Sequence, residues 1–264
     1  PVYNADGTYN EDGPYANPVA IANEAVNESQ NFRTLANVFA NYFILDGLSF
    51  ETKWAIDYLS LEEHSYDPVT TRQGQKYNGL GYDANTRASN FNTNNLLRYS
   101  TAIRQTDEFE ALLGYSYERF VDRRSFIRGT DFPNENFQYL VSAASITEAS
   151  SSIVEDRTNS FFGKAKYNMN NKYLLNVSAR YDGSSNFGAN NKYGFFPAIS
   201  AAWRLSEEGF MKNQKFINEL KFRASYGLTG NDEIARYGSL ALYDGRGNYN
   251  RQAGIYPIQM PNPD

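Results

Sequence analysis

Acid–base or metal chemistry would need histidine, cysteine or paired carboxylates at defined spacing, and this sequence offers few such sets. His64 is the only histidine among 264 residues, and it directly follows Glu62 and Glu63. A zinc site would need further ligands, and a catalytic triad would need a matching nucleophile. The absence of cysteine excludes a thiolate ligand or nucleophile. We therefore interpret His64 as an exposed loop residue, and the sequence predicts no enzyme, metal site or cofactor.

The other charged residues recur at every second position, opposite apolar ones. In the run FETKWAIDY, one face carries Phe50, Thr52, Trp54, Ile56 and Tyr58, and the other carries Glu51, Lys53, Ala55 and Asp57. A period of two indicates a strand with one apolar and one polar face. Paired carboxylates could exchange protons, but mixed charge is the ordinary lining of a water-filled barrel. We expect the apolar face to meet lipid, and the candidate lumen-facing residues are Glu51, Lys53, Asp57, Arg180, Lys221 and Arg223.

The same alternation predicts eight strands, near 32–44, 48–60, 95–105, 108–120, 158–169, 172–181, 195–205 and 219–229. Each is close to or longer than the ~9–11 residues that cross a bilayer as a tilted strand. Several exceed the usual length of about 5–6 residues in globular proteins. Tyrosines near the strand ends suit an aromatic girdle at the membrane boundary. They are Tyr58, Tyr115, Tyr117, Tyr181 and Tyr226.

The connections between these strands alternate in length. Short turns are expected around 45–47, 106–107 and 170–171, and long polar loops at 61–94, 121–157 and 182–194. Short turns on one side and long loops on the other are typical of an outer-membrane barrel. The segment 206–218 departs from this pattern and predicts a small periplasmic helix capped by Ser206. Loop aromatics are candidates for extracellular contacts with a substrate, namely Tyr66, Tyr77 and Tyr82.

Composition narrows the class of protein further. The chain is rich in aromatic residues, with 21 Tyr and 18 Phe. Its formal net charge of −5 argues against a nucleic-acid-binding surface. Mean hydropathy is −0.62, and the apolar runs fall short of the ~18 residues of a transmembrane helix. The strands of a transmembrane β-barrel contain no such continuous apolar run, because only every second residue is apolar. The fold class predicted is therefore all-β, an antiparallel transmembrane β-barrel segment.

Three motifs carry a resemblance to a known family. They are RYDGSSNFG at 180–188, NKYGFFPAISAAWRLSEEGFM from 191, and ELKFRASYGLTGNDEI from 219. Together they resemble the SusC/RagA-like branch of TonB-dependent outer-membrane transporters. The motif residues, for which we expect structural roles, are Arg180, Asp182, Gly183, Ser184, Ser185, Phe187, Gly188, Pro197 and Trp203.

The resemblance implies that residues 1–264 form part of one β-barrel domain in the outer membrane of a Gram-negative cell. The signal peptide, the plug domain and the barrel C-terminus would lie outside this chain, and about eight strands would belong to a barrel of about 22. The implied activity is energy-coupled import of oligosaccharides or peptides, without covalent chemistry. Implied partners are a SusD-like lipoprotein, the TonB complex acting through the plug, the glycan or peptide substrate and outer-membrane lipid. The alternative is a small self-contained barrel with a structural or adhesive role.

Two structural expectations follow. RYDGSSNFG should end a strand and begin a loop that folds back, with Phe187 packed, Gly183 and Gly188 supplying special backbone geometry, and Asp182 or Ser184 bonding local backbone donors. The first and last strands should lack partners within this chain, because a segment of a larger barrel has two open edges.

Overall fold

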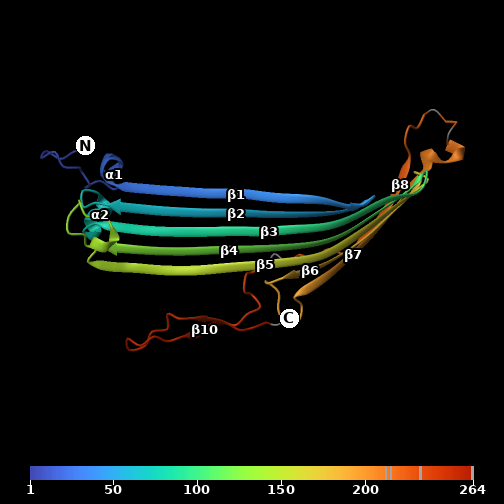
Figure 1. Ribbon diagram of the computed structural model, residues 1–264. Coiled ribbons are helices and arrows are strands. Elements are labelled where there is room, and N and C mark those ends of the chain that lie inside the picture. The colour runs from blue at the N-terminus through green and yellow to red at the C-terminus, as the bar shows by residue number, and fades with distance from the viewer. Residues whose placement is uncertain (212, 215, 232–233, 263–264) are drawn as a thin grey trace. The chain divides into compact units, whose positions relative to one another are not determined.

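The computed structural model describes residues 1–211, 213–214, 216–231 and 234–262. Strands dominate it (Figure 1), and they are β1 (Val26–Leu45), β2 (Leu48–Asp67), β3 (Leu80–Arg104), β4 (Asp107–Thr130), β5 (Ser145–Met169), β6 (Tyr173–Ser184), β7 (Tyr193–Arg204), β8 (Lys221–Gly227), β9 (Leu242–Asp244) and β10 (Tyr256–Gln259). The helices are α1 (Pro18–Glu24) and α2 (Arg72–Tyr77), with single 3₁₀ turns η1 (Leu140–Ser142), η2 (Leu205–Glu207) and η3 (Gly209–Met211). Within the described part of the chain, no helix is long and apolar enough to cross a membrane.

All eight predicted strands are present, and they form one sheet in the order β1-β2-β3-β4-β5-β6-β7-β8. Every strand therefore pairs with its neighbours in sequence, as a meander of hairpins does. The order leaves β1 and β8 at the two edges of the sheet, which confirms the expected open edges for the described residues. A separate two-stranded sheet contains β9 and β10.

The predicted long loops at 61–94 and 121–157 were wrong. Strands β1 to β5 run for 20 to 25 residues, so most of these segments are strand. Only residues 68–79 and 131–144 lie between strands there. The polar composition of these segments suggested loops, but backbone pairing between neighbouring strands does not depend on an apolar face. Strands β6 and β7 have 12 residues each, close to the expected length.

The chain contains two compact units, the first made of residues 1–35, 56–90 and 120–155. Its core holds Tyr66 and Phe132, which are 1% and 4% exposed and whose rings meet edge to face at 5.0 Å. Thr71 begins α2 by accepting a hydrogen bond from the Gly74 backbone N–H at 3.1 Å. Gly79 follows with φ 87°, a conformation that side chains disfavour, and a Cβ there would lie 3.1 Å from Phe132.

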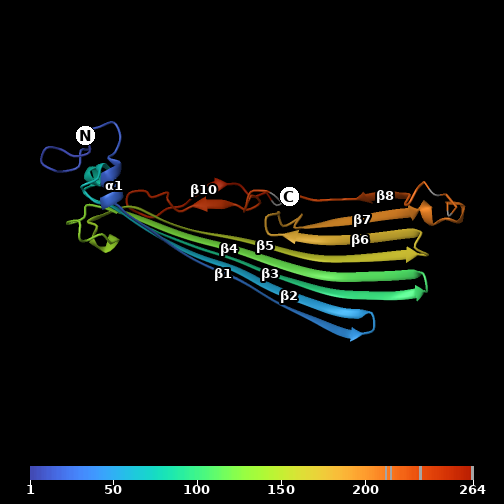
Figure 2. The same ribbon diagram turned by 90° about the horizontal axis from the view of Figure 1, so that it is seen from above.

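The second unit comprises residues 36–55, 91–119 and 156–264. Its strands β6, β7 and β8 lie side by side as consecutive antiparallel strands (Figure 2). The short turns predicted between strands are confirmed. Asn170 and Asn171 both have positive φ, 51° and 57°, which is the geometry that twists a tight hairpin correctly.

The helix predicted over 206–218 was wrong for the residues described there. The segment contains η2 and η3 instead, and Ser206 lies inside η2 rather than capping a helix. The Ser206 backbone N–H donates to the Leu220 carbonyl at 3.2 Å, and Glu208 is held by side chains of other elements. The backbone of the segment instead forms bonds between residues three apart, from the Glu208 N–H to the Leu205 carbonyl and from the Met211 N–H to the Glu208 carbonyl, both at 3.0 Å.

Candidate functional site

The register of β6, β7 and β8 sorts their side chains onto two faces. Val177 lies opposite Ile199, which lies opposite Tyr226, whereas Ala202 lies opposite Arg223. The apolar face carries Tyr173, Leu175, Val177, Tyr181, Phe195, Ile199, Trp203, Phe222 and Tyr226. The polar face, including the paired strand β5, carries Lys164, Lys166, Asn168, Asn176, Ser178, Arg180, Ser200, Lys221, Arg223 and Ser225. The alternation predicted from the sequence is therefore confirmed for these strands.

Aromatic pairs mark two levels of the apolar face. Tyr173 stacks on Trp203 with ring centroids 6.4 Å apart, and Tyr181 stacks on Tyr193 at 4.9 Å. The two levels are separated by eight residues of β6 (181 − 173), about 26 Å along the strand. A tilt of about 40° reduces this to about 20 Å, near the roughly 25 Å apolar band of such barrels. This spacing is suited to the two boundaries of a bilayer.

Strand β2 shows the same separation of faces. Asp57 accepts both hydrogen bonds of a bidentate Arg33 contact, at 2.9 and 2.6 Å, and Glu51 lies 3.5 Å from Arg98. Trp54, with the opposite parity in β2, contacts Phe91 at 5.8 Å between ring centroids. The charged and aromatic residues predicted to lie on opposite faces of this strand do so.

Three further lumen candidates lie on the polar face. Arg180 makes two 3.1 Å hydrogen bonds to Asp182, and its guanidinium lies 5.0 Å above the ring of Phe162. Lys221 and Arg223 begin β8 at alternate positions. All three point to the same side of the sheet, as the sequence predicted.

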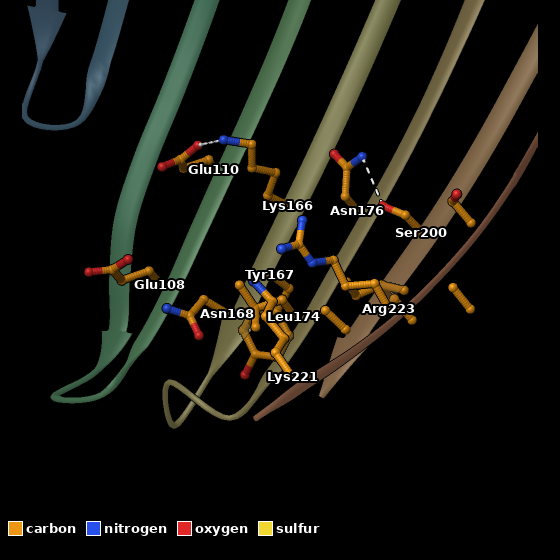
Figure 3. A pocket seen from close by; sticks show the side chains of 15 residues that line it. Glu108, Glu110, Lys166, Tyr167, Asn168, Leu174, Asn176, Ser200, Lys221 and Arg223 are labelled. Carbon is orange, nitrogen blue, oxygen red and sulfur yellow. Dashed lines mark hydrogen bonds and ion pairs between the residues drawn. The ribbon is translucent and has the colours of Figure 1, made fainter. Parts of the chain in front are cut away.

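A hollow of about 570 Å³ opens on the polar face, and Figure 3 shows the side chains that line it. One row across its floor is Asn168 opposite Leu174, Leu174 opposite Ala202, and Ala202 opposite Arg223. The adjacent row runs from Lys166 through Asn176 and Ser200 to Ser225. Small or short side chains in β7 and β8 leave the space that the hollow occupies.

Strand β4 closes the acidic side of this hollow. Glu110 receives a hydrogen bond from Lys166 at 2.9 Å, and Glu108 lies beside them on the same lining (Figure 3). Sequence reasoning did not single out Glu108 or Lys166. Their alternation phase was visible in the sequence. Their meeting in one hollow depends on a register that the sequence does not show.

The RYDGSSNFG motif extends β6 rather than leaving it. Strand β6 ends at Ser184, not at 181, so the loop begins later than predicted. The Ser184 hydroxyl accepts from the Asn186 backbone N–H at 3.3 Å, which confirms its expected local bonding. The Ser185 hydroxyl accepts from the Arg157 backbone N–H at 2.9 Å, and the Ser185 N–H donates to the Arg157 carbonyl. The motif thus fastens its loop to the neighbouring strand β5.

Gly183 has a different role from the one predicted. It does not adopt the left-handed backbone conformation, and a Cβ there would lie 2.3 Å from the Tyr193 ring. Gly183 leaves space for the ring of Tyr193 on β7, which stacks on Tyr181 of β6. Phe187 is half-buried, as expected, and lines a hollow of about 350 Å³ on the polar face, together with Arg180 and Phe196.

The expected loop positions of His64 and the candidate tyrosines require correction. Tyr66 lies in β2 and is buried, Tyr82 lies in β3, and Tyr77 ends α2. His64 lies in β2, where its Nδ1 is 2.6 Å from an Asp83 oxygen and its ring stacks on Tyr139. Tyr66, His64 and Tyr82 belong to strands because β2 ends later, and β3 begins earlier, than predicted, whereas Tyr77 does lie in the connection between these two strands. Among the described residues, no cluster of three or more His, Asp or Glu side chains could hold a metal.

The turn after β7 contains a strongly bound carboxylate. Glu208 accepts hydrogen bonds from Lys172 at 2.9 Å, from Tyr173 at 2.7 Å and from the Trp203 indole at 3.1 Å. These hydrogen bonds lower the pKa of Glu208 from 4.5 to about 2, and the bond from Lys172 has the largest effect. The motif residue Trp203 therefore helps to join η2 and η3 to the end of the sheet.

Comparison with known proteins identifies relatives. The family model described as TonB dependent receptor-like, beta-barrel matches residues 2–264. TonB-dependent receptor P26 of Formosa agariphila is 35% identical over 260 residues, covering 92% of this chain and 26% of that protein. TonB-dependent receptor P3 of the same organism is 34% identical over 247 residues, covering 92% and 25%. The chain spans about a quarter of the length of these curated relatives.

One more relative and one solved structure are also similar to this chain. The TonB-dependent receptor SusC of Bacteroides thetaiotaomicron is 28% identical over 171 residues, which is 64% of this chain and 17% of SusC. The solved structure of the RagAB peptide transporter superposes with a TM-score of 0.82 at 22% identity, covering 92% of this chain and 27% of that one. At that identity the likeness shows a shared fold.

Proposed function

This chain belongs to the TonB-dependent receptor β-barrel family, and from that membership we propose that it forms part of the wall of an energy-coupled outer-membrane importer. The family is one of receptors in the outer membrane rather than of enzymes. The substrates proposed are oligosaccharides or peptides too large for simple diffusion. Substrate would be captured with a SusD-like lipoprotein at the cell surface. The TonB complex would open the path by acting on a plug outside this chain.

The observation that carries this proposal is the two-faced sheet of β5 to β8. Its apolar face has aromatic pairs at two levels, and its polar face has charged residues around a hollow. An aqueous lumen on one side and lipid on the other would place each face in a favourable environment. We accordingly assign Glu51, Lys53, Asp57, Arg180, Lys221 and Arg223 to the lumen wall.

The exposed residues of edge strand β1 support a larger barrel. Val38 and Phe39 point to opposite faces, yet they are 70% and 71% exposed. An unpaired strand edge in lipid costs several kcal/mol for each unsatisfied backbone group. Further polypeptide would therefore continue the sheet from β1 and from β8. Production of residues 1–264 alone tests the alternative, since a folded, heat-resistant band would support a self-contained barrel and aggregation would support the larger one.

Deletion of the gene for the full-length receptor in its own bacterium tests import. Growth on oligosaccharides or peptide mixtures as sole carbon source should fall, while growth on monosaccharides and free amino acids should not. A plasmid copy should restore growth, and collapse of the proton gradient should abolish uptake. Equal growth of both strains on every substrate would contradict the proposal. Purification of the full-length receptor should also recover a lipoprotein partner.

A further inference from the structure

The connection between β7 and β8 differs from the other turns at its end of the sheet. It comprises residues 205–220 (Figure 1), which we call the periplasmic segment. The Arg204 backbone N–H donates to the Lys172 carbonyl at 2.8 Å, so the segment begins beside the short turn between β5 and β6. Short turns lie at the periplasmic end of an outer-membrane barrel. The other turns at this end are residues 46–47, 105–106 and 170–172.

Three apolar side chains of the periplasmic segment are exposed. Phe216 is 100% exposed, Phe210 is 70% exposed and Ile217 is 41% exposed. The short turns, by contrast, consist of Asp, Gly, Gln, Thr, Asn and Lys. Apolar side chains that gather in one exposed segment mark a surface that contacts a protein or a membrane. The length and the composition of this connection therefore both set it apart as an interaction surface.

Hydrogen bonds hold the apolar tip of the segment in a defined turn. The Gln214 side-chain oxygen accepts from the backbone N–H groups of Phe216 at 3.0 Å and of Ile217 at 2.8 Å. The Gln214 side-chain nitrogen donates to the Ile217 carbonyl at 2.6 Å. At the base of the segment, the Ser206 N–H donates to the Leu220 carbonyl at 3.2 Å. The backbone that carries Phe216 and Ile217 is thus held in place before any partner binds.

The periplasmic segment begins at the aromatic edge of the lipid-facing surface. Trp203 lies opposite Tyr173 on β6 and opposite Phe222 on β8, so these three apolar-face residues form one row across the sheet. Glu208 of the segment accepts hydrogen bonds from the Tyr173 hydroxyl and the Trp203 indole. The start of the segment is therefore fastened to side chains that face lipid. Its exposed apolar residues continue a surface whose partner is the membrane.

We propose that the periplasmic segment is a membrane anchor, with Phe210, Phe216 and Ile217 inserted among phospholipids of the periplasmic leaflet. Interfacial segments of this kind bury apolar side chains about 5–10 Å deep, where headgroups meet acyl chains. Aromatic side chains gather at the same level around transmembrane barrels. The anchor goes beyond the import proposed above, because it concerns how the barrel is seated in the membrane rather than what passes through it.

Fluorescence quenching in the full-length receptor tests the anchor. Phe216→Cys and Phe210→Cys, each in an otherwise cysteine-free receptor, are labelled with bimane and reconstituted into phosphatidylethanolamine–phosphatidylglycerol vesicles. Lipids brominated near the headgroup should lower both signals about twofold or more, and lipids brominated at the chain end should lower them less, since the insertion is shallow. Asp46→Cys is the matched control, because Asp46 is an exposed residue of a short turn at the same end. Its label should be quenched by aqueous iodide and not by brominated lipid.

Three results would overturn the anchor. Quenching of the labels at 210 and 216 by iodide alone would place the segment in water. Quenching by neither agent would show that protein covers it, and equal lipid quenching at position 46 would show that the segment has no special contact. Uptake by the same receptors is measured separately. A negative quenching result with normal uptake refutes the anchor and leaves the importer proposal intact.

Discussion

Phe132→Ala should release the segment 131–144 from the first compact unit. Phe132 is 4% exposed, contacts Tyr66 edge to face at 5.0 Å, and lies against Gly79. Its backbone N–H donates to the Asn78 carbonyl at 2.9 Å. Both the side chain and the backbone of Phe132 therefore connect the segment 131–144 to Asn78 and Gly79. Removing the ring leaves a cavity beside Tyr66 and takes away the contacts of Phe132 with Tyr66 and Gly79.

Truncation of a buried Phe to Ala costs about 3–5 kcal/mol in other proteins. We take about 3 kcal/mol, the lower end of that range. If the segment opens locally, this loss raises the population of the open form by about 150-fold, because about 1.4 kcal/mol corresponds to a factor of ten.

Hydrogen exchange of the full-length receptor, followed by mass spectrometry, measures this opening directly. Amides of 130–144 should exchange about 100-fold faster in Phe132→Ala, while peptides from β6 and β7 should not change. Val141→Ala is the matched control, since Val141 lies in the same segment and is 94% exposed. Unchanged exchange in 130–144, or an equal effect of the control, would refute the assignment of Phe132 as the anchor.

Three other predictions address the second unit and the first hairpin. Gly183→Ala should destabilise the receptor by about 1–3 kcal/mol, because its Cβ would meet Tyr193; a thermal melt that matches wild type would contradict this. Glu208→Gln should destabilise the receptor at neutral pH. The pKa of Glu208 in the folded protein is lowered from 4.5 to about 2. The stability that its carboxylate contributes is therefore present above pH 4.5 and is lost as the pH falls toward 2. The thermal melting temperatures of wild type and Glu208→Gln should converge across that range. The Trp54→Cys variant should react with a membrane-soluble maleimide, and the Lys53→Cys variant should react with a water-soluble one. The reverse pattern of labelling would show that the lipid-facing and lumen-facing sides of β2 are assigned the wrong way.

The sequence was sufficient for the fold class because a strand displays its two environments one residue apart. The phase of Phe50, Glu51 and Trp54 could be seen without coordinates, and so could that of Lys221 and Arg223. Turn chemistry was equally local, as in the paired asparagines at 170 and 171, whose positive φ values suit a tight hairpin. The motif around Arg180 also indicated the family from the sequence alone.

Tertiary structure alone decided where strands end and which polar residues meet. Strands β2 to β5 continue past the predicted ends because pairing with a neighbour, rather than side-chain pattern, satisfies their backbone groups. Tyr66 and His64 consequently lie in a strand rather than in a loop. The hollow lined by Glu108 and Arg223 arises from the register of five neighbouring strands, which brings together residues far apart in the sequence. Composition and alternation therefore determined the two faces of this protein, and long-range pairing determined the site on one of them.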